Sequence, residues 1–170
     1  MGWRAELLVP RSRVRSGAVV IEVPQAAIDL AKHFEGFHRV PRMNPGRAHP
    51  YICPAGYWTI GYGHLCDPKH PPIGEAEAEI FLAHDLQTAL SATLRYCPVL
   101  AAEPEGRLSA IVDFTFNLGA GRLQTSTLRR RVNQRNWVAA GQELRRWVYG
   151  GGRILPGLVA RREGEVSLLS

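Results

Sequence analysis

The sequence predicts an α+β fold in which a small β-hairpin region precedes a mainly helical region. Two short β-prone runs lie close together within residues 51–62, and from Glu75 onward the apolar residues recur at helical spacing. The chain has 170 residues, of which 45% are hydrophobic and 21% charged. This composition suits one compact domain and excludes wholesale disorder.

The first 22 residues are rich in arginine and have no clean periodicity. We expect residues 1–22 to form a flexible leader outside a single folded domain that spans residues 23–170. No uncharged apolar run approaches the roughly 20 residues that cross a bilayer, and the start of the chain has no signal-peptide core. We therefore expect a protein that is made in soluble form, without a transmembrane segment.

The first predicted helix runs from Pro24 to Glu35. Proline suits the first turn of a helix, and apolar residues follow it at helical spacing up to Phe34. Gly36 comes next and is a natural C-terminal stop. Glu35 is therefore expected on the last turn of a short amphipathic helix.

A β-hairpin is expected from the runs at residues 51–53 and 57–62. Between them, residues 54–56 form a short turn that ends in glycine. An isolated hairpin is only marginally stable, so this one is expected to lean on another part of the chain.

The helical periodicity after the hairpin predicts several helices. One runs from Glu75 to about Tyr96, with glutamates in its first turns, as the helix dipole favours. The next opens at Pro104, carries a wide apolar stripe and ends at Gly119; its apolar density predicts the central, most buried helix. Shorter helices are expected near residues 127–134, 136–148 and 156–168.

The positive charge is unevenly distributed. The net charge is +6, and of the 21 cations only Lys32 and Lys69 are lysines. Residues 122–162 contain ten arginines against one acid, Glu143. Such asymmetry indicates an anionic partner, namely nucleic acid, a membrane surface or a bacterial envelope polymer. The alternative is a solvated surface that only maintains solubility.

Three cysteines, Cys53, Cys66 and Cys97, are too few for a disulfide scaffold. Cys53 and Cys66 lie close in sequence to His64 and His70, but the spacing does not match the usual paired zinc ligands. We therefore expect neither a metal ion nor another cofactor.

A glutamate at a helix end, Cys53 and Thr59 on a hairpin, and the run Thr-Ile-Gly-Tyr-Gly-His at residues 59–64 form a recognisable combination. It resembles the phage-type lysozymes, glycoside hydrolase family 24, whose signature is Glu, then Asp or sometimes Cys, then Thr six residues later. The resemblance covers roughly residues 24–168. Two departures are the cysteine itself and a loop around residues 41–49 that lengthens the stretch from Glu35 to Cys53. Further matches lie at residues 116–119, 137, 156–158 and 161–163.

The resemblance implies a two-lobed lysozyme-like fold. A hairpin lobe at about residues 38–65 would face a helical lobe at about residues 75–170, completed by the helix at 24–35. It implies hydrolysis of the β-1,4 bond between N-acetylmuramic acid and N-acetylglucosamine in bacterial peptidoglycan. The implied context is a monomeric phage endolysin that waits in the host cytoplasm until the membrane is permeabilised.

Two other functions are considered. The first is a non-catalytic peptidoglycan-binding relative that has lost its second catalytic carboxylate. The second is a nucleic-acid-binding domain, which is disfavoured because the aromatic residues are not interleaved with the basic ones as stacking platforms would be.

Glu35 is the expected general acid. The C-terminal end of a helix carries partial negative charge, and Phe34, Phe37 and a covering hairpin would remove water from the carboxyl group. Both effects favour the protonated form that a general acid needs. Without the downstream motif, Glu35 would be an ordinary helix-end glutamate.

Cys53 stands where most of the family carries a carboxylate. It is expected either to position water as a polarised thiol or to act as a nucleophile; the alternative is a small buried hydrophobic residue. A free thiol is mostly protonated at neutral pH, and the loop cations Arg39, Arg42 and Arg47 are candidates for stabilising its thiolate.

The remaining site residues have less direct roles. The Thr59 hydroxyl suits the holding of a water molecule, and Gly61 and Gly63 let the backbone approach a bulky polymer. His64 is expected to be a structural hydrogen-bonding residue, with Asp67 as its candidate partner. By similarity to the family, the saccharide cleft is lined by Leu65, Phe116, Asn117 and Thr127.

Overall fold

The computed structural model describes the chain except for residues 1–13, 17–18, 39–40, 43 and 54–55. The longer helices are α1 (Gln25–Glu35), α2 (Glu75–Tyr96), α3 (Glu105–Leu118) and α7 (Pro156–Ser167). The predicted helix ends at Glu35, Tyr96 and Gly119 agree with the bounds of the first three. The shorter helices are η1 (Pro98–Ala102, a 3-10 helix), α4 (Ala120–Thr125), α5 (Thr127–Asn133) and α6 (Trp137–Leu144).

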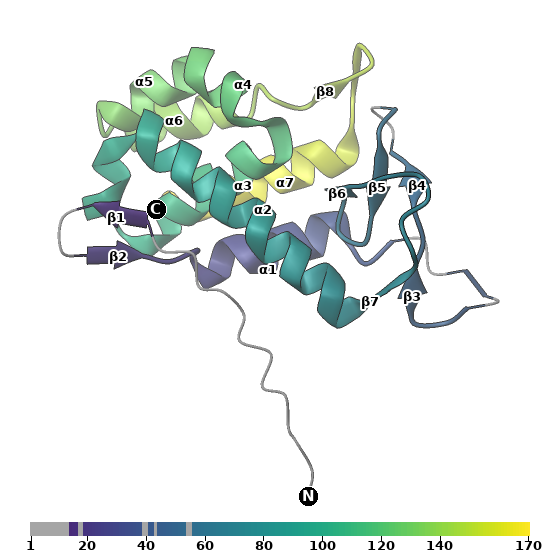
Figure 1. The fold of residues 1–170 in the computed structure, drawn as a ribbon. Helices are drawn as coiled ribbons and strands as arrows, with labels where there is room; N and C mark the ends of the chain where they lie inside the picture. Colours follow the sequence, from purple (N-terminus) through teal and green to yellow (C-terminus); the bar gives the residue numbers. More distant parts are fainter. Residues whose placement is uncertain (1–13, 17–18, 39–40, 43, 54–55) are drawn as a thin grey trace, which may run out of the picture.

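The strands are short and antiparallel. One sheet has the order β4 (Tyr51–Ile52), β5 (Trp58–Ile60), β6 (His64–Leu65), and β3 (Arg47–Ala48) pairs with β7 (Ile73–Gly74). These five strands lie together at one end of the molecule, beside the helices (Figure 1). The arrangement confirms the predicted α+β fold with a small β region and a mainly helical region. Two further pairs are β1 (Val14–Ser16) with β2 (Val19–Ile21), and β8 (Tyr149–Gly150) with β9 (Arg153–Ile154).

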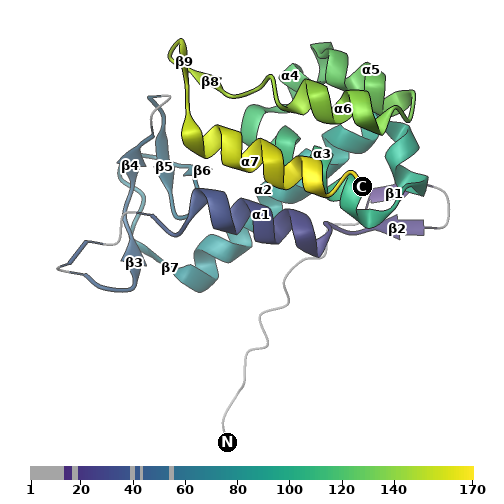
Figure 2. The same ribbon diagram turned by 180° about the vertical axis from the view of Figure 1, so that it is seen from behind.

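The core is built around α3. Every residue from 108 to 115 is buried, so this helix is covered on all sides, as its apolar density predicted. It packs against α1, α2, α4 and α7. Seen from behind, α1 and α7 run side by side in front of α3 (Figure 2). The end of α1 that carries Glu35 is thereby held beside both α3 and α7.

The β lobe is anchored to the start of α2. Ile60 of β5 and Ile73 of β7 are both fully buried, and β6 and β7 both contact α2. The loop around residues 41–49, which lengthens this lobe, is closed by the β3–β7 pair. The hairpin therefore gains the support that an isolated hairpin lacks.

Several features differ from the sequence-based expectations. Two strands that were not predicted, β1 and β2, pair within the expected leader, and Ile21 packs against the core. The helix expected over residues 136–148 ends at Leu144, and α4 and β6 were not predicted. The remaining leader residues 1–13 lie outside the described part of the chain, and the domain boundary after residue 22 stays a prediction. Within the described residues, no helix combines the length and apolar character needed to cross a membrane.

Candidate active site

A cavity of about 1200 Å³ lies where the β lobe meets the helices. Its walls come from the end of α1, the β4–β6 sheet, the middle of α2, the end of α3 and the start of α4. The predicted residues Glu35, Cys53 and Thr59 all line it. The other lining residues are Phe34, His38, Tyr51, Tyr62, Gly63, His64, Leu65, His84, Asp85, Thr88, Ala89, Ala92, Thr115, Phe116, Asn117, Gly119 and Ala120.

Glu35 is the last residue of α1, and its side chain is 28% exposed. Its Oε1 atom accepts a hydrogen bond of 2.6 Å from Nη1 of Arg161 on α7. Its other oxygen, Oε2, faces Gly63, since a Cβ atom placed on that glycine would lie 3.6 Å from it. One carboxyl oxygen is thus held by the helical lobe, and the other is directed at the β lobe.

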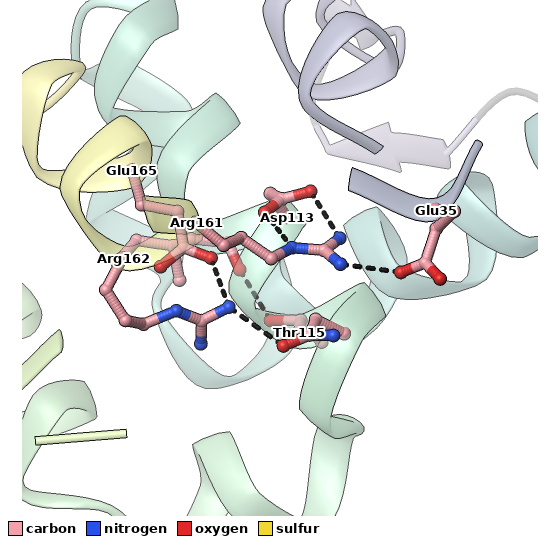
Figure 3. A network of polar contacts seen from close by, with 8 residues as sticks. Glu35, Asp113, Thr115, Arg161, Arg162 and Glu165 are labelled. Atoms are coloured by element: carbon pink, nitrogen blue, oxygen red, sulfur yellow. Dashed lines mark hydrogen bonds and ion pairs between the residues drawn. The ribbon is translucent and has the colours of Figure 1, made fainter. Parts of the chain in front are cut away.

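Arg161 is the centre of a buried ion network that the sequence did not reveal. Its Nε and Nη2 atoms donate to the two carboxylate oxygens of Asp113 at 2.8 Å each, and Asp113 is fully buried (Figure 3). The guanidinium lies 5.6 Å and 5.8 Å from the ring centres of Phe34 and Phe116. Burial acts to lower the pKa of Arg161, but the bonds and charges of Asp113 and Glu35 outweigh it and raise that pKa. Arg161 is therefore a permanent cation beside Glu35.

Cys53 and Thr59 are fixed by the hairpin backbone. The Cys53 amide donates to the carbonyl of Tyr57 at 2.9 Å, and the Cys53 side chain is half-buried. Thr59 is only 3% exposed, and its hydroxyl donates to the carbonyl of Tyr51 at 3.4 Å. Because that hydroxyl donates to the backbone, its oxygen remains able to accept a hydrogen bond.

The loop cations are only partly described. Arg39 lies outside the described residues. Arg42 is exposed, and Nη1 of Arg47 donates to the carbonyl of Pro72 at 2.9 Å, which joins the loop to the start of β7. The role of these cations in stabilising a Cys53 thiolate stays a prediction.

Two glycines of the motif are required by the backbone geometry. Gly61 and Gly63 have φ angles of 62° and 88°, a region that disfavours any residue with a Cβ atom. At Gly61 a Cβ would also lie 2.7 Å from the side chain of Ala78 on α2. Gly61 therefore permits the close packing of the β lobe on α2, and Gly63 faces the carboxyl group of Glu35.

The hydrogen-bond partner predicted for His64 is wrong. Nδ1 of His64 lies 2.8 Å from Oδ2 of Asp85 on α2, and the imidazole stacks on Phe81 with 4.5 Å between ring centres. Asp67 instead accepts a hydrogen bond from the Lys69 amide at 2.7 Å, as in a local turn. Asp67 lies near His64 in the sequence, but Asp85, 21 residues away, is brought to His64 by the packing of α2 on the β lobe.

The residues predicted to bind saccharide divide into two groups. Leu65, Phe116 and Asn117 line the cavity. Thr127 does not; it is the first residue of α5, and its hydroxyl accepts a hydrogen bond of 3.1 Å from Arg130. Leu65 is 65% exposed, so its apolar side chain is open to solvent where it lines the cavity.

The sequence reasoning missed several polar residues at this site. Asp113 was detectable, because an aspartate within the apolar stripe of a central helix needs a buried cationic partner. His38, His84 and Thr88 line the cavity without any pattern that would have marked them. Among the described residues, no group of three or more His, Cys, Asp or Glu side chains is placed to hold a metal ion.

Comparison with known proteins places this architecture in a family. The phage lysozyme family matches residues 32–165, and the chain belongs to that family. The endolysin of Bacillus phage B103 is 34% identical over 150 residues, which cover 87% of this chain and 54% of that protein. The SAR-endolysin of Bacteriophage PS119 is 39% identical over 121 residues, covering 70% and 71%. The chain thus spans about half the length of the Bacillus phage relative.

Solved structures agree with this assignment. The muramidase domain of SpmX from Asticaccaulis excentricus has a TM-score of 0.72 and 27% identity, covering 87% of this chain and 97% of that one. The active form of the P1 phage endolysin Lyz also has a TM-score of 0.72, at 24% identity, covering 88% and 85%. The lysozyme-like fold predicted from the sequence is therefore confirmed.

Proposed function

We propose that this chain is an endolysin muramidase that hydrolyses the β-1,4 bond between N-acetylmuramic acid and N-acetylglucosamine in bacterial peptidoglycan. Membership of the phage lysozyme family and relatives named endolysin support this proposal. The observation that carries it is the meeting of Glu35, Cys53 and Thr59 in one large cavity. No cofactor enters the proposed reaction.

Glu35 acts as the general acid in this proposal. Arg161 holds Oε1, which leaves Oε2, on the side of Gly63, to carry the proton to the leaving oxygen. Asp113 takes two of the donors of Arg161 and offsets much of its charge. Arg161 therefore divides its hydrogen-bond donors between two carboxyl groups.

Cys53 and Thr59 act on the opposite side of the reaction. As the glycosidic bond breaks, the leaving oxygen takes the proton of Glu35; water bonds to the anomeric carbon, and the proton that the water releases restores the Glu35 carboxyl group. If Cys53 is a nucleophile, its sulfur first bonds to that carbon and the water then displaces it. The Thr59 oxygen, whose own proton is directed at Tyr51, accepts a hydrogen bond from that water. Cys53 takes the place of the carboxylate that most of the family carries, as a polarised thiol or as a nucleophile.

The role of Cys53 is tested by two substitutions. Cys53→Ala should keep the fold and lose most wall-hydrolysing activity, whereas Cys53→Asp should keep substantial activity. Burial raises the pKa of the Cys97 thiol to about 12, so alkylation near neutral pH should avoid Cys97. Cys66 is half-buried like Cys53, so the alkylation is carried out in a Cys66→Ser background. Alkylation should inactivate the enzyme, and substrate fragments should slow that inactivation. Undiminished activity of Cys53→Ala would reduce Cys53 to a packing residue.

The alternative, a non-catalytic wall-binding protein, is separated by its products. Purified peptidoglycan is incubated with the protein while turbidity and new reducing ends are measured. Clearing with new reducing ends on N-acetylmuramic acid supports the muramidase. Binding to the wall without new reducing ends would favour the alternative.

The site of action and the role of the positive charge are also part of the proposal. The protein is made in the host cytoplasm and reaches the wall after the membrane is permeabilised. Of the ten arginines at residues 122–162, the two of α7 have acidic partners, as do Arg135 and the pair that follows α6, Arg145 and Arg146. Within the described chain, Arg122 of α4 and Arg129, Arg130 and Arg131 of α5 form no ion pair. We assign attraction to the anionic envelope to this unpaired cluster on α4 and α5.

A further inference from the structure

Asn117 on the cavity wall is held by a buried arginine. Its Oδ1 atom accepts a hydrogen bond of 2.8 Å from Nη2 of Arg162, a side chain with no exposed surface. A guanidinium carries donors only, so it accepts just one orientation of the amide group. Oδ1 must face Arg162, and the NH₂ group must turn away from it.

The surroundings of Arg162 make this orientation hard to change. Glu165, also fully buried, forms an ion pair with Nη2 of Arg162 at 2.8 Å (Figure 3). The centre of the Phe114 ring lies 5.3 Å from the Arg162 guanidinium. Nε and Nη1 of Arg162 find no hydrogen-bond acceptor in the described part of the chain. A flipped Asn117 would direct its NH₂ group at a buried guanidinium and remove the hydrogen bond between them, leaving Glu165 as the one close acidic partner of Arg162 in the described part of the chain, which is strongly unfavourable.

The NH₂ group of Asn117 is available to a ligand. Asn117 lines the cavity. Its Nδ2 atom is not a buried atom left without a hydrogen-bond partner, so a ligand in the cavity can reach it. Peptidoglycan offers amide carbonyl oxygens as neutral acceptors, both on its acetamido groups and on its stem peptides. A pair of N–H donors fixed in the wall would bind such an oxygen and discriminate against a donor at the same place.

We propose that Arg162 and Glu165 are positioning residues that lock the Asn117 amide with its N–H donors toward the cavity, so that the site selects an amide carbonyl oxygen of the substrate. The selection of substrate rests on the proposed function. Two consecutive arginines of α7 then serve the two ends of the site. Arg161 holds the acid Glu35, and Arg162 orients the binding group Asn117.

The test removes the hydrogen bond from Arg162 to Asn117 without leaving either Arg162 or Glu165 as an unpaired buried charge. In the double variant Arg162→Met/Glu165→Met, apolar side chains replace the whole ion pair, a change that often keeps or raises stability. We expect an unchanged or higher Tm and a KM for peptidoglycan raised about three- to tenfold, the value of one hydrogen bond, with a smaller change in kcat. In an Asn117→Ala background, the same double substitution should leave KM unchanged. A folded double variant with the wild-type KM would overturn the proposal, as would an equal KM change in the Asn117→Ala background.

A binding experiment separates this proposal from the failure of the proposed function. In the Glu35→Gln background, the Kd is measured for N-acetylglucosamine oligomers and for glycan fragments that carry stem peptides. Weaker binding of both ligands by the double variant identifies the acetamido carbonyl, and weaker binding of the peptide-bearing ligand alone identifies a stem-peptide carbonyl. Asn117→Asp keeps the acceptor for Arg162 but removes the N–H donors, so it should weaken ligand binding to a similar degree. This variant tests the N–H donors of Asn117 even if the double variant does not fold. Unchanged Kd values in Asn117→Asp would refute the lock even if wild type hydrolyses the wall; absence of hydrolysis by wild type would refute only the proposed function.

Discussion

Glu35 and Gly63 face each other at the junction of the two lobes. Gly63 has a φ angle of 88°, and a Cβ placed there would make an ordinary contact of 3.6 Å with Oε2 of Glu35. Gly46 has nearly the same φ, 83°, but a Cβ placed there would meet nothing within 4 Å. The two glycines therefore form a matched pair for separating backbone strain from contact with the acid.

Gly63→Ala and Gly46→Ala should both lower the free energy of unfolding, by about 1–2 kcal/mol each, since both place an L-residue in the left-handed region. Only Gly63→Ala should also lower kcat, by about tenfold or more, because relief of its backbone strain would shift the segment that contacts Glu35, and small displacements at a catalytic group are costly. Denaturant unfolding and wall hydrolysis measure the two effects. Equal kcat values in the two variants would exclude contact between this glycine and the catalytic acid.

At the residue scale, the site residues that could be predicted are those that lie near one another along the chain. Glu35, Cys53 and Thr59 were recognisable from a motif within 25 residues, and all three line the cavity. Arg161 lies 126 residues from Glu35, and nothing in the local pattern of α7 indicated which carboxylates it would meet. Ion pairs across such distances depend on how helices pack, which periodicity alone does not determine.

At the scale of elements, the His64–Asp85 contact joins β6 to α2. Both side chains are about 70% buried, and they meet at 2.8 Å. Asp85→Ala should lower the free energy of unfolding by about 1–2 kcal/mol, since the His64 imidazole loses its partner at a largely buried contact. Asp67→Asn is the control, because asparagine can still accept the hydrogen bond of the Lys69 amide. Thermal or denaturant unfolding measures both; equal losses would show that the contact with α2 contributes nothing specific.

The longer elements were predictable because their signals are local. Acidic residues in the first turn of α2, an apolar stripe along α3 and glycines after α1 and α3 all marked helix positions correctly. β6 and the β3–β7 pair were not predictable, because their two-residue strands form only against partners brought in by the fold. The six residues of α4 are likewise too few to display a helical period.

At the scale of the whole molecule, ion pairs between described residues divide the arginines of residues 122–162 into a paired and an unpaired set. If the unpaired cluster on α4 and α5 attracts the wall, the rate of lysis should fall as salt rises, because such attraction is screened over about 8–10 Å near physiological ionic strength. Changing Arg129, Arg130 and Arg131 to Gln should flatten that dependence. Changing Arg135, Arg145 and Arg146 to Gln removes the same formal charge and should flatten it less. Identical salt dependence in wild type and both triple variants would make the cluster an ordinary solvated surface.

The central claim is that Glu35 supplies the proton for cleavage of the glycan strand. Glu35→Gln tests it most directly, because glutamine keeps an oxygen for Arg161 but has no acidic proton. Wild type, Glu35→Gln and the exposed control Glu77→Gln are compared for new reducing ends released from purified peptidoglycan, with Tm measured for each. The account predicts that wild type and Glu77→Gln release reducing ends, whereas folded Glu35→Gln releases none above background. Measurable turnover by folded Glu35→Gln would contradict it.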